Sequence, residues 1–94
     1  MFTLPTKYDE LEWWERRAVR EQYASEQDGK CWHCKGPLDG KPEGADANMR
    51  VTRRLFPASF FKHPVHLHHC HRTGMTIGAV HNHCNAVLWE RYGQ

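Results

Sequence analysis

The sequence reads CWHC at residues 31–34 and HNHC at residues 81–84, and we expect the fold to depend on this shared spacing. In each stretch the first and last side chains can face one ion from a single turn of chain. Three thiolates and an imidazole form a closed tetrahedral zinc site, which adds directly to the free energy of folding. We therefore predict a structural zinc ion. A redox Cys-x-x-Cys motif is the alternative, although no βαβ pattern surrounds these cysteines. The predicted ligands are Cys31, Cys34, His81 and Cys84.

The size and composition of the chain favour a small domain held together by metal. It has 94 residues, of which 39% are hydrophobic, so a single domain with a thin core is expected. Four Cys and eight His indicate metal sites rather than disulfides in a reducing cytosol. Neither a membrane span of roughly 18 apolar residues nor a signal peptide is recognisable. We expect a soluble, cytoplasmic protein with no membrane partner.

Charge is divided unevenly along the chain. Residues 1–48 carry a net charge of −3, whereas residues 49–94 carry +5 and seven of the eight His. A cationic, His-rich half suits a polyanionic partner such as DNA, and the alternative is an ordinary solvated basic face. The side chains that we expect to contact phosphates are Arg50, Arg53, Arg54, Lys62 and Arg72.

The first half of the chain predicts one helix over residues 9–27. Thr6 and Asp9 form a candidate capping box at its start. Trp13 and Trp14 are expected to pack in the core or at its edge, with stacking on nucleic-acid bases as the alternative. The residues expected on the buried face are Leu11, Trp14, Ala18 and Tyr23.

The second half predicts two strands and a helix. Residues 35–64 are rich in Gly, Pro and Asp at their start and are expected to be a loop or insertion, with a basic strand at 49–56. Strands are predicted at 65–71 and 75–80 around a Gly turn, followed by a helix from 81 to 92 that ends at Gly93. The expected fold class is therefore small α+β.

A second group of ligand-type side chains lies outside the predicted zinc site. Most side chains of this group are imidazoles. Buried imidazoles need hydrogen-bonding partners, and few carboxylates lie near them in sequence, so they cannot all be satisfied core groups. A second zinc site or a solvated His-rich edge would also explain them. Cys70 could replace His81 in the zinc site, but on a strand it would point with His66 and His68 toward the second group. The group comprises His66, His68, His69, Cys70, His71 and Asn85.

Two of these stretches, HHCHRTG at 68–74 and VHNHCN at 80–85, resemble the ββα-metal (His-Me finger) core of HNH endonucleases. They are most similar to the phage recombination endonuclease VII-like branch. The stretch at 23–34 also resembles the helix and first zinc knuckle of that branch. Residues 35–64 show no such match. The resemblance implies a single HNH domain over residues 1–94, with the ββα-metal motif at 65–92 and zinc knuckles at 31–34 and 81–84.

The resemblance also implies a role for each matching residue. His69 corresponds to the general base that activates water, and His71 to a residue near the scissile phosphate or metal. His68 and Asn85 correspond to ligands of a catalytic divalent ion. The implied activity is single-metal hydrolysis or nicking of DNA, leaving 5′-phosphate and 3′-hydroxyl ends. The branch includes junction resolvases that work as dimers, so the resemblance also implies a possible homodimer. It further implies that the protein acts in a phage-infected bacterial cell.

The chain departs from this branch at two positions. His68 replaces the usual Asp, and a softer imidazole ligand should admit Mn²⁺, Ni²⁺, Co²⁺ or Zn²⁺ as well as Mg²⁺. His81 replaces a Cys, which should weaken zinc binding. Two other functions remain as alternatives: a non-catalytic, zinc-stabilised module that binds nucleic acid, and an adaptor that binds another protein.

Overall fold

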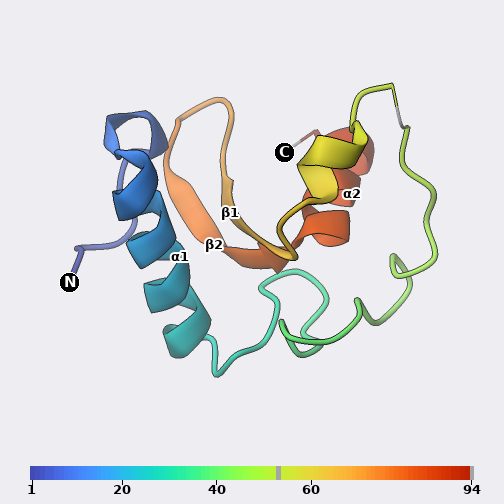
Figure 1. Ribbon diagram of the computed structural model, residues 1–94, viewed down its shortest axis with the longest axis horizontal. Coiled ribbons are helices and arrows are strands. Elements are labelled where there is room, and N and C mark those ends of the chain that lie inside the picture. Colours follow the sequence, from blue (N-terminus) through green and yellow to red (C-terminus); the bar gives the residue numbers. More distant parts are fainter. Residues whose placement is uncertain (53, 94) are drawn as a thin grey trace.

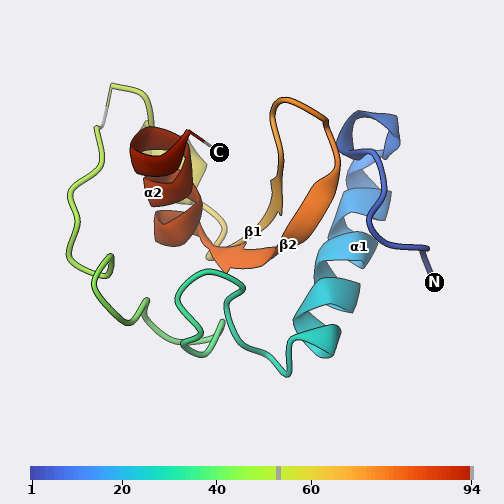
Figure 2. The same cartoon turned by 180° about the vertical axis from the view of Figure 1, so that it is seen from behind.

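The computed structural model describes residues 1–52 and 54–93. The β-hairpin lies between two helices, with helix α1 on one side and helix α2 on the other (Figures 1 and 2). This arrangement confirms the predicted small α+β fold, in which an N-terminal helix precedes a hairpin and a C-terminal helix. In chain order the elements are the 3₁₀ turn η1 (Tyr8–Glu10), α1 (Trp13–Glu26), the 3₁₀ turn η2 (Ala58–Phe61), strands β1 (Val65–His69) and β2 (Thr76–His81), and α2 (Asn82–Tyr92).

The hairpin pairs β1 and β2 in antiparallel register, with Val65 opposite His81 and Leu67 opposite Ala79. The register shifts between His68 and His69, which marks a β-bulge. Among the described residues the sheet has only these two strands, so the outer edge of β1 has no strand neighbour. The hairpin therefore presents an open edge beside its bulge.

The N-terminal segment is tied to the hairpin turn. The Thr76 N–H donates to the Thr6 carbonyl at 2.8 Å, and the Tyr8 N–H donates to the Gly74 carbonyl at 2.8 Å. The buried hydroxyls of Tyr23 and Thr76 lie 2.9 Å apart and are hydrogen-bonded, which attaches α1 to the same place. These contacts hold Tyr8 against the end of β1.

Helix α1 begins four residues later than predicted. The predicted capping box of Thr6 and Asp9 is wrong, because Thr6 pairs with Thr76 instead. Glu12 and Glu15 form the capping box, in which the Glu15 side chain accepts a hydrogen bond from the Glu12 N–H at 2.9 Å. Tyr8, Asp9 and Glu10 thus form η1 rather than a first turn of α1.

The buried face of α1 differs from the predicted one. Val19 and Tyr23 point into the core, whereas Ala18 and Trp14 are exposed. Trp13 is 72% exposed and Trp14 55% exposed, so the prediction that they pack in or beside the core is wrong. The hairpin selects the face that carries Val19 because its β-branched side chain fits against Leu67, Ala79 and Val80, all of them buried in one cluster.

The segment at 35–52 crosses the end of the hairpin and then runs past α2 (Figure 1). The predicted strand at 49–56 is wrong for the residues that the structure describes there, because none of them pairs with a strand. This stretch is held by α2 instead: Thr52 donates its backbone N–H to the Glu90 carboxylate at 3.2 Å, and its hydroxyl donates to the same side chain. Phe56 is 3% exposed and anchors the end of the segment.

The end of α1 is attached to β2 through the amide of Gln27. This side chain accepts a hydrogen bond from the Ala79 N–H at 2.9 Å and donates to the Ala79 carbonyl at 2.9 Å. A Cβ on Gly78 would lie 2.8 Å from the Gln27 Oε1 atom, so β2 needs glycine at this position. Gln27 therefore pairs with β2 as a neighbouring strand would.

Replacing this amide should destabilise the fold. We expect Gln27→Ala to lower the free energy of unfolding by about 1–3 kcal/mol, because the N–H of buried Ala79 would lose its acceptor. The Ala79 carbonyl would keep the Trp32 N–H as a donor at 2.9 Å. Gln22→Ala is the matched control, since Gln22 makes the same paired contact with Phe2 near the chain end. Urea unfolding of both variants measures the difference. Equal losses would contradict the role given to Gln27.

Candidate functional site

The four predicted zinc ligands come together in one cluster. One ligand atom from each of Cys31, Cys34, His81 and Cys84 lies within 4.8 Å of the others. Cys31 and Cys84 are 1% exposed and His81 is 3% exposed. The turn after α1 supplies two ligands, the end of β2 supplies His81, and the first turn of α2 supplies Cys84. Cys70 lies in the hairpin turn outside this cluster, so the Cys₄ alternative is wrong.

The surroundings of the cluster fit a zinc ion. His81 donates its Nε2–H to the Pro37 carbonyl at 2.7 Å, which leaves Nδ1 free to bind metal. That Nδ1 atom lies 3.4 Å from the sulfur of Cys34 and 3.7 Å from that of Cys84. The backbone N–H groups of Gly36 and Glu43 both donate to the Cys34 sulfur at 3.4 Å. Such outer contacts orient the imidazole and favour the thiolate.

The pKa values of two thiols in the cluster are shifted in opposite directions. A hydrogen bond with Cys84 holds the pKa of Cys31 well below its ordinary 9.0, and the same contact raises the pKa of Cys84. Zinc binds the thiolate form, so binding would release the protons that remain. The cluster is consistent with a structural zinc ion that joins α1, the hairpin and α2.

Zinc content and stability should fall together when a ligand is removed. We expect about one zinc ion per chain in the parent protein, and loss of both zinc and folded structure in Cys34→Ala. Cys70→Ala is the control, because Cys70 lies outside the cluster. Metal analysis and thermal unfolding followed by circular dichroism measure both effects. A zinc-free protein with an unchanged unfolding temperature would contradict the structural role.

The second group of side chains lies where β1 faces α2. Asn85, in the first turns of α2, sits between His66 and His68 of β1. Its side-chain N–H donates to Nδ1 of His66 at 3.0 Å, and its Oδ1 accepts from Nδ1 of His68 at 3.2 Å. Burial lowers the pKa of His66 to about 4, so this imidazole is neutral near pH 7 and can accept the bond. His66 thereby turns the amide oxygen of Asn85 toward His68.

His69 lies on the opposite face of β1, because neighbouring side chains of a strand alternate between its two faces. Its ring stacks on Tyr8, with centroids 3.8 Å apart and an angle of 10° between the planes. His71 lies beside it at 4.7 Å. Burial lowers the pKa of His69 below its ordinary 6.5, and His71 lowers it further. Its Nδ1 atom is buried without a hydrogen-bond partner among the described residues. His69 is therefore a neutral imidazole with a fixed ring.

A groove of about 480 Å³ runs along the open edge of β1, between α1 and η2. His66, His69, His71 and Asn85 line it, so it joins the two parts of the second group. No Asp or Glu lines this groove, whereas two arginines of α1 do. A smaller hollow of about 260 Å³ adjoins it, and both hollows share Phe60, His71 and Asn85.

Sequence reasoning missed several residues of this groove. Arg16 and Arg20 are not among the predicted site residues, yet both are half-buried and line the groove. The Arg16 guanidinium lies 3.9 Å above the Tyr8 ring and donates to the Tyr8 carbonyl. The spacing of these arginines, four residues apart, is a signal for one helical face, but the sequence alone does not show what that face meets.

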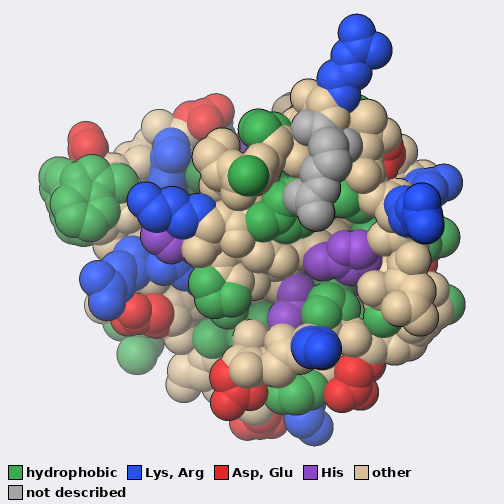
Figure 3. All heavy atoms as spheres, turned by 45° about the vertical axis from the view of Figure 1, so that its right-hand side comes forward, with side chains coloured by type: hydrophobic (Ala, Val, Ile, Leu, Met, Phe, Trp, Pro, Cys, Tyr) green, Lys and Arg blue, Asp and Glu red, His purple; other side chains and the backbone are tan. Residues whose placement is uncertain are grey.

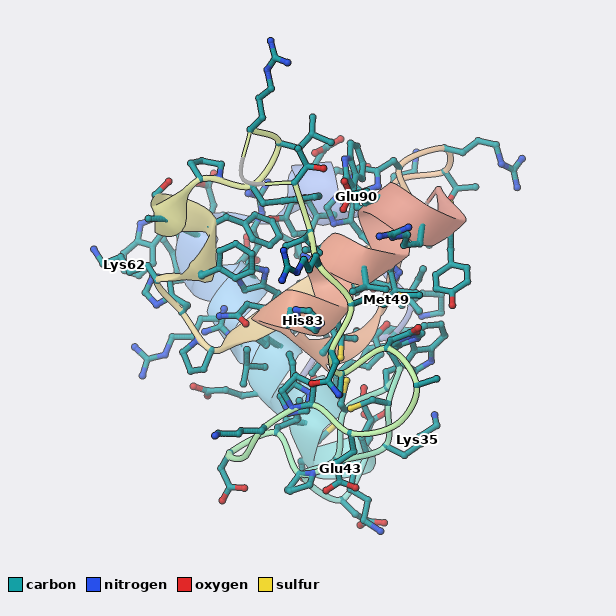
Figure 4. All side chains as sticks on the ribbon, turned by 90° about the vertical axis from the view of Figure 1, so that its right-hand side faces the viewer. Lys35, Glu43, Met49, Lys62, His83 and Glu90 are labelled. Atoms are coloured by element: carbon teal, nitrogen blue, oxygen red, sulfur yellow. The ribbon has the colours of Figure 1, made fainter. Side chains whose placement is uncertain are left out.

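The basic residues predicted to contact phosphates lie elsewhere. Arg50, Arg54, Lys62 and Arg72 are exposed, and none lines the groove that holds His69. Arg53 lies outside the described residues. Figure 4 shows Lys62 near η2, apart from Met49 and His83, where the long segment crosses α2. In Figure 3 several imidazoles of this side lie in recesses between other side chains, while Lys and Arg side chains project at its edges.

Comparison with known proteins assigns no family. No protein-family model matches the chain, and searches of curated proteins and of solved structures give no match either. None of the helices in the described ranges is both long and apolar enough to cross a membrane. The features available for a functional argument are therefore the Cys₃His cluster, the hairpin and helix that it joins, and the groove beside them.

Proposed function

We propose that this chain is a zinc-stapled, metal-dependent endonuclease of the HNH type that hydrolyses DNA phosphodiester bonds. The observation that supports this proposal best is the 3.2 Å contact between His68 on β1 and Asn85 on α2. These are the two residues to which the HNH resemblance assigns the catalytic metal. They come from opposite sides of a hairpin–helix junction, next to the residue that the same resemblance makes the general base.

His69 has the properties that general-base catalysis requires. Burial keeps its imidazole neutral near pH 7, and stacking on Tyr8 holds the ring in place. A neutral imidazole at the wall of a groove can take a proton from water as that water attacks a phosphate. Arg16 and Arg20 on the opposite wall would hold the negative phosphate groups. Arg50, Arg54, Lys62 and Arg72 would add contacts to phosphates farther along the DNA.

The donors of His68 and Asn85 fit a divalent ion. An imidazole nitrogen and an amide oxygen suit ions such as Mn²⁺, Co²⁺, Ni²⁺ and Zn²⁺, and Mg²⁺ less well. When bound, the ion would supply Lewis-acid stabilisation of charge on the scissile phosphate and the leaving oxygen. The hydrogen bond from Asn85 to His66 prepares the amide oxygen for this role, because it fixes which end of the amide faces His68.

Removing the imidazole of His69 should abolish most cleavage. We expect His69→Ala to nick supercoiled DNA about 10²–10⁴-fold more slowly than the parent, with zinc content and folding retained. His83→Ala is the control, because His83 lies outside the groove and bonds to the Asp46 carbonyl. Plasmid nicking across a series of divalent ions measures both rates.

The pH dependence gives the same hypothesis a second check. Cleavage requires neutral His69, so the rate should rise with pH, and the midpoint of the rise should lie below the ordinary imidazole value of 6.5, because burial and His71 lower the pKa. Arg16 lowers the pKa as well, whereas Asp9 raises it. The nuclease proposal would be wrong if His69→Ala cleaved DNA at the parental rate, or if the parent protein cleaved no DNA with any divalent ion.

Changing the proposed ligand His68 should change the metal preference. We expect His68→Ala to lose activity with every ion. In His68→Asp the ratio of the rate in Mg²⁺ to the rate in Mn²⁺ should be higher than in the parent, because a carboxylate is a harder ligand than an imidazole. Nicking rates in Mg²⁺ and Mn²⁺, at matched zinc content, measure this shift. An unchanged ratio of the two rates in His68→Asp would remove His68 from the metal site.

One observation favours the second candidate, a non-catalytic, zinc-stabilised module that binds nucleic acid. Among the described residues, the Cys₃His cluster is the one group of three or more Cys, His, Asp or Glu ligands. His68 is also 0% exposed. DNA binding without cleavage under all metal conditions would favour this module over the nuclease.

A further inference from the structure

The first turns of α1 carry an unusual exposed surface. Trp13 and Trp14 stand out from the helix, and their rings meet edge to face with centroids 5.8 Å apart. An exposed tryptophan loses the free energy that burial of its large ring would contribute. Only Trp13 of this pair lines the groove that contains His69. The two neighbouring tryptophans therefore differ in what they face.

Trp13 shares its helical face with the two arginines of the groove. Trp13, Arg16 and Arg20 follow one another at steps of three and four residues, which places them along one side of α1. Neither arginine forms an ion pair with a carboxylate among the described residues, whereas the neighbouring Arg17 pairs with Glu21 at 3.1 Å. Both act on the imidazoles opposite: Arg16 lowers the pKa of His69 and Arg20 that of His66, each as a minor cause beside burial.

This surface matches the chemistry of an unpaired nucleotide. Ser59, Phe60 and His63 form the facing wall and, like the α1 wall, bring no carboxylate into the groove. An aromatic face beside a cationic track is the arrangement by which proteins bind single-stranded DNA: bases stack on the ring and phosphates meet the arginines. A duplex keeps both faces of its internal bases stacked on neighbouring bases, so it offers Trp13 no internal base face on which to stack.

We propose that the groove between α1 and η2 binds a single-stranded segment of DNA, with one base stacked on Trp13 and its phosphates held by Arg16 and Arg20. This inference rests on the proposed function and specifies its substrate as DNA with unpaired nucleotides beside the cleaved bond. Trp13 and Arg16 line the same groove; the Arg16 guanidinium lies over the Tyr8 ring, and Tyr8 stacks on His69. A strand that enters at Trp13 thus reaches the proposed general base.

Binding without cleavage tests the proposal directly. The zinc-loaded full chain, with no divalent ion added, is titrated into a fluorescein-labelled thymidine oligonucleotide of about 12 nucleotides and into a duplex of equal length. Fluorescence anisotropy gives both dissociation constants. We expect tighter binding to the oligonucleotide, and a loss of at least about fivefold in Trp13→Ala for this ligand only. Arg20→Gln should weaken the binding of both ligands. It should also reduce the slope of log affinity against log salt concentration by the amount expected for about one phosphate contact.

Trp14→Ala is the matched control, because Trp14 is equally part of the first helical turn but does not line the groove. It should bind the oligonucleotide like the parent. Quenching of tryptophan fluorescence by the oligonucleotide should be reduced in Trp13→Phe and kept in Trp14→Phe. Thermal unfolding checks that each variant is folded.

Three results would overturn the proposal: parental affinity of Trp13→Ala for the oligonucleotide, equal losses in Trp13→Ala and Trp14→Ala, or preference of the parent for the duplex. Each of the three would leave the proposed nuclease standing. Binding to neither DNA would contradict both proposals. Oligonucleotide binding that depends on Trp13, without cleavage under any metal condition, would support the groove and reject the nuclease.

Discussion

The convergence of three thiols and one imidazole on a single point is the constraint on which the rest of the structure depends. His81 stands at its centre: it ends β2, directly precedes α2 and contacts the knuckle that follows α1. The hydrogen bond to Pro37 fixes its ring and leaves Nδ1 facing the sulfur atoms. With few large side chains fully buried, the core offers little else to set the angle between hairpin and helix. A metal at this cluster would supply that restraint.

The same constraint positions the candidate site. Asn85 follows Cys84 directly, so the cluster determines how the first turn of α2 faces β1. His66 then orients the amide of Asn85 toward His68. Neighbouring side chains of a strand point to opposite faces, so His69 faces Tyr8 while His68 faces α2. The restraint at the cluster and the alternation of β1 thus divide neighbouring imidazoles between two different tasks.

Helix α1 contributes to both ends of this arrangement. Gln27 attaches its C-terminal end to β2, close to the cluster, while its N-terminal half carries Arg16 and Trp13 along the open edge of β1. The edge is open because the sheet has two strands among the described residues, and Thr52, in the segment predicted to form a further strand, is held by Glu90 of α2 instead. An unpaired strand edge is available for ligands, and here cationic and aromatic groups flank it rather than another strand.

The sequence by itself determined the four members of the cluster and the order of the N-terminal helix, the hairpin and the C-terminal helix, whereas the pairing of His68 with Asn85 was expected only from the HNH resemblance. The cluster and this order depend on local spacing, since ligands three residues apart face one point and Gly74 and Gly93 permit the positive φ angles of a turn and a helix end. Only the tertiary structure decided which face of α1 is buried, the fate of residues 49–56 and the position of Arg16 and Arg20 in the groove. Periodicity shows that side chains share a face, but not which neighbour that face meets. Trp13 and Trp14 are the clearest case, because their size favours burial, whereas the hairpin packs against the face that carries Val19.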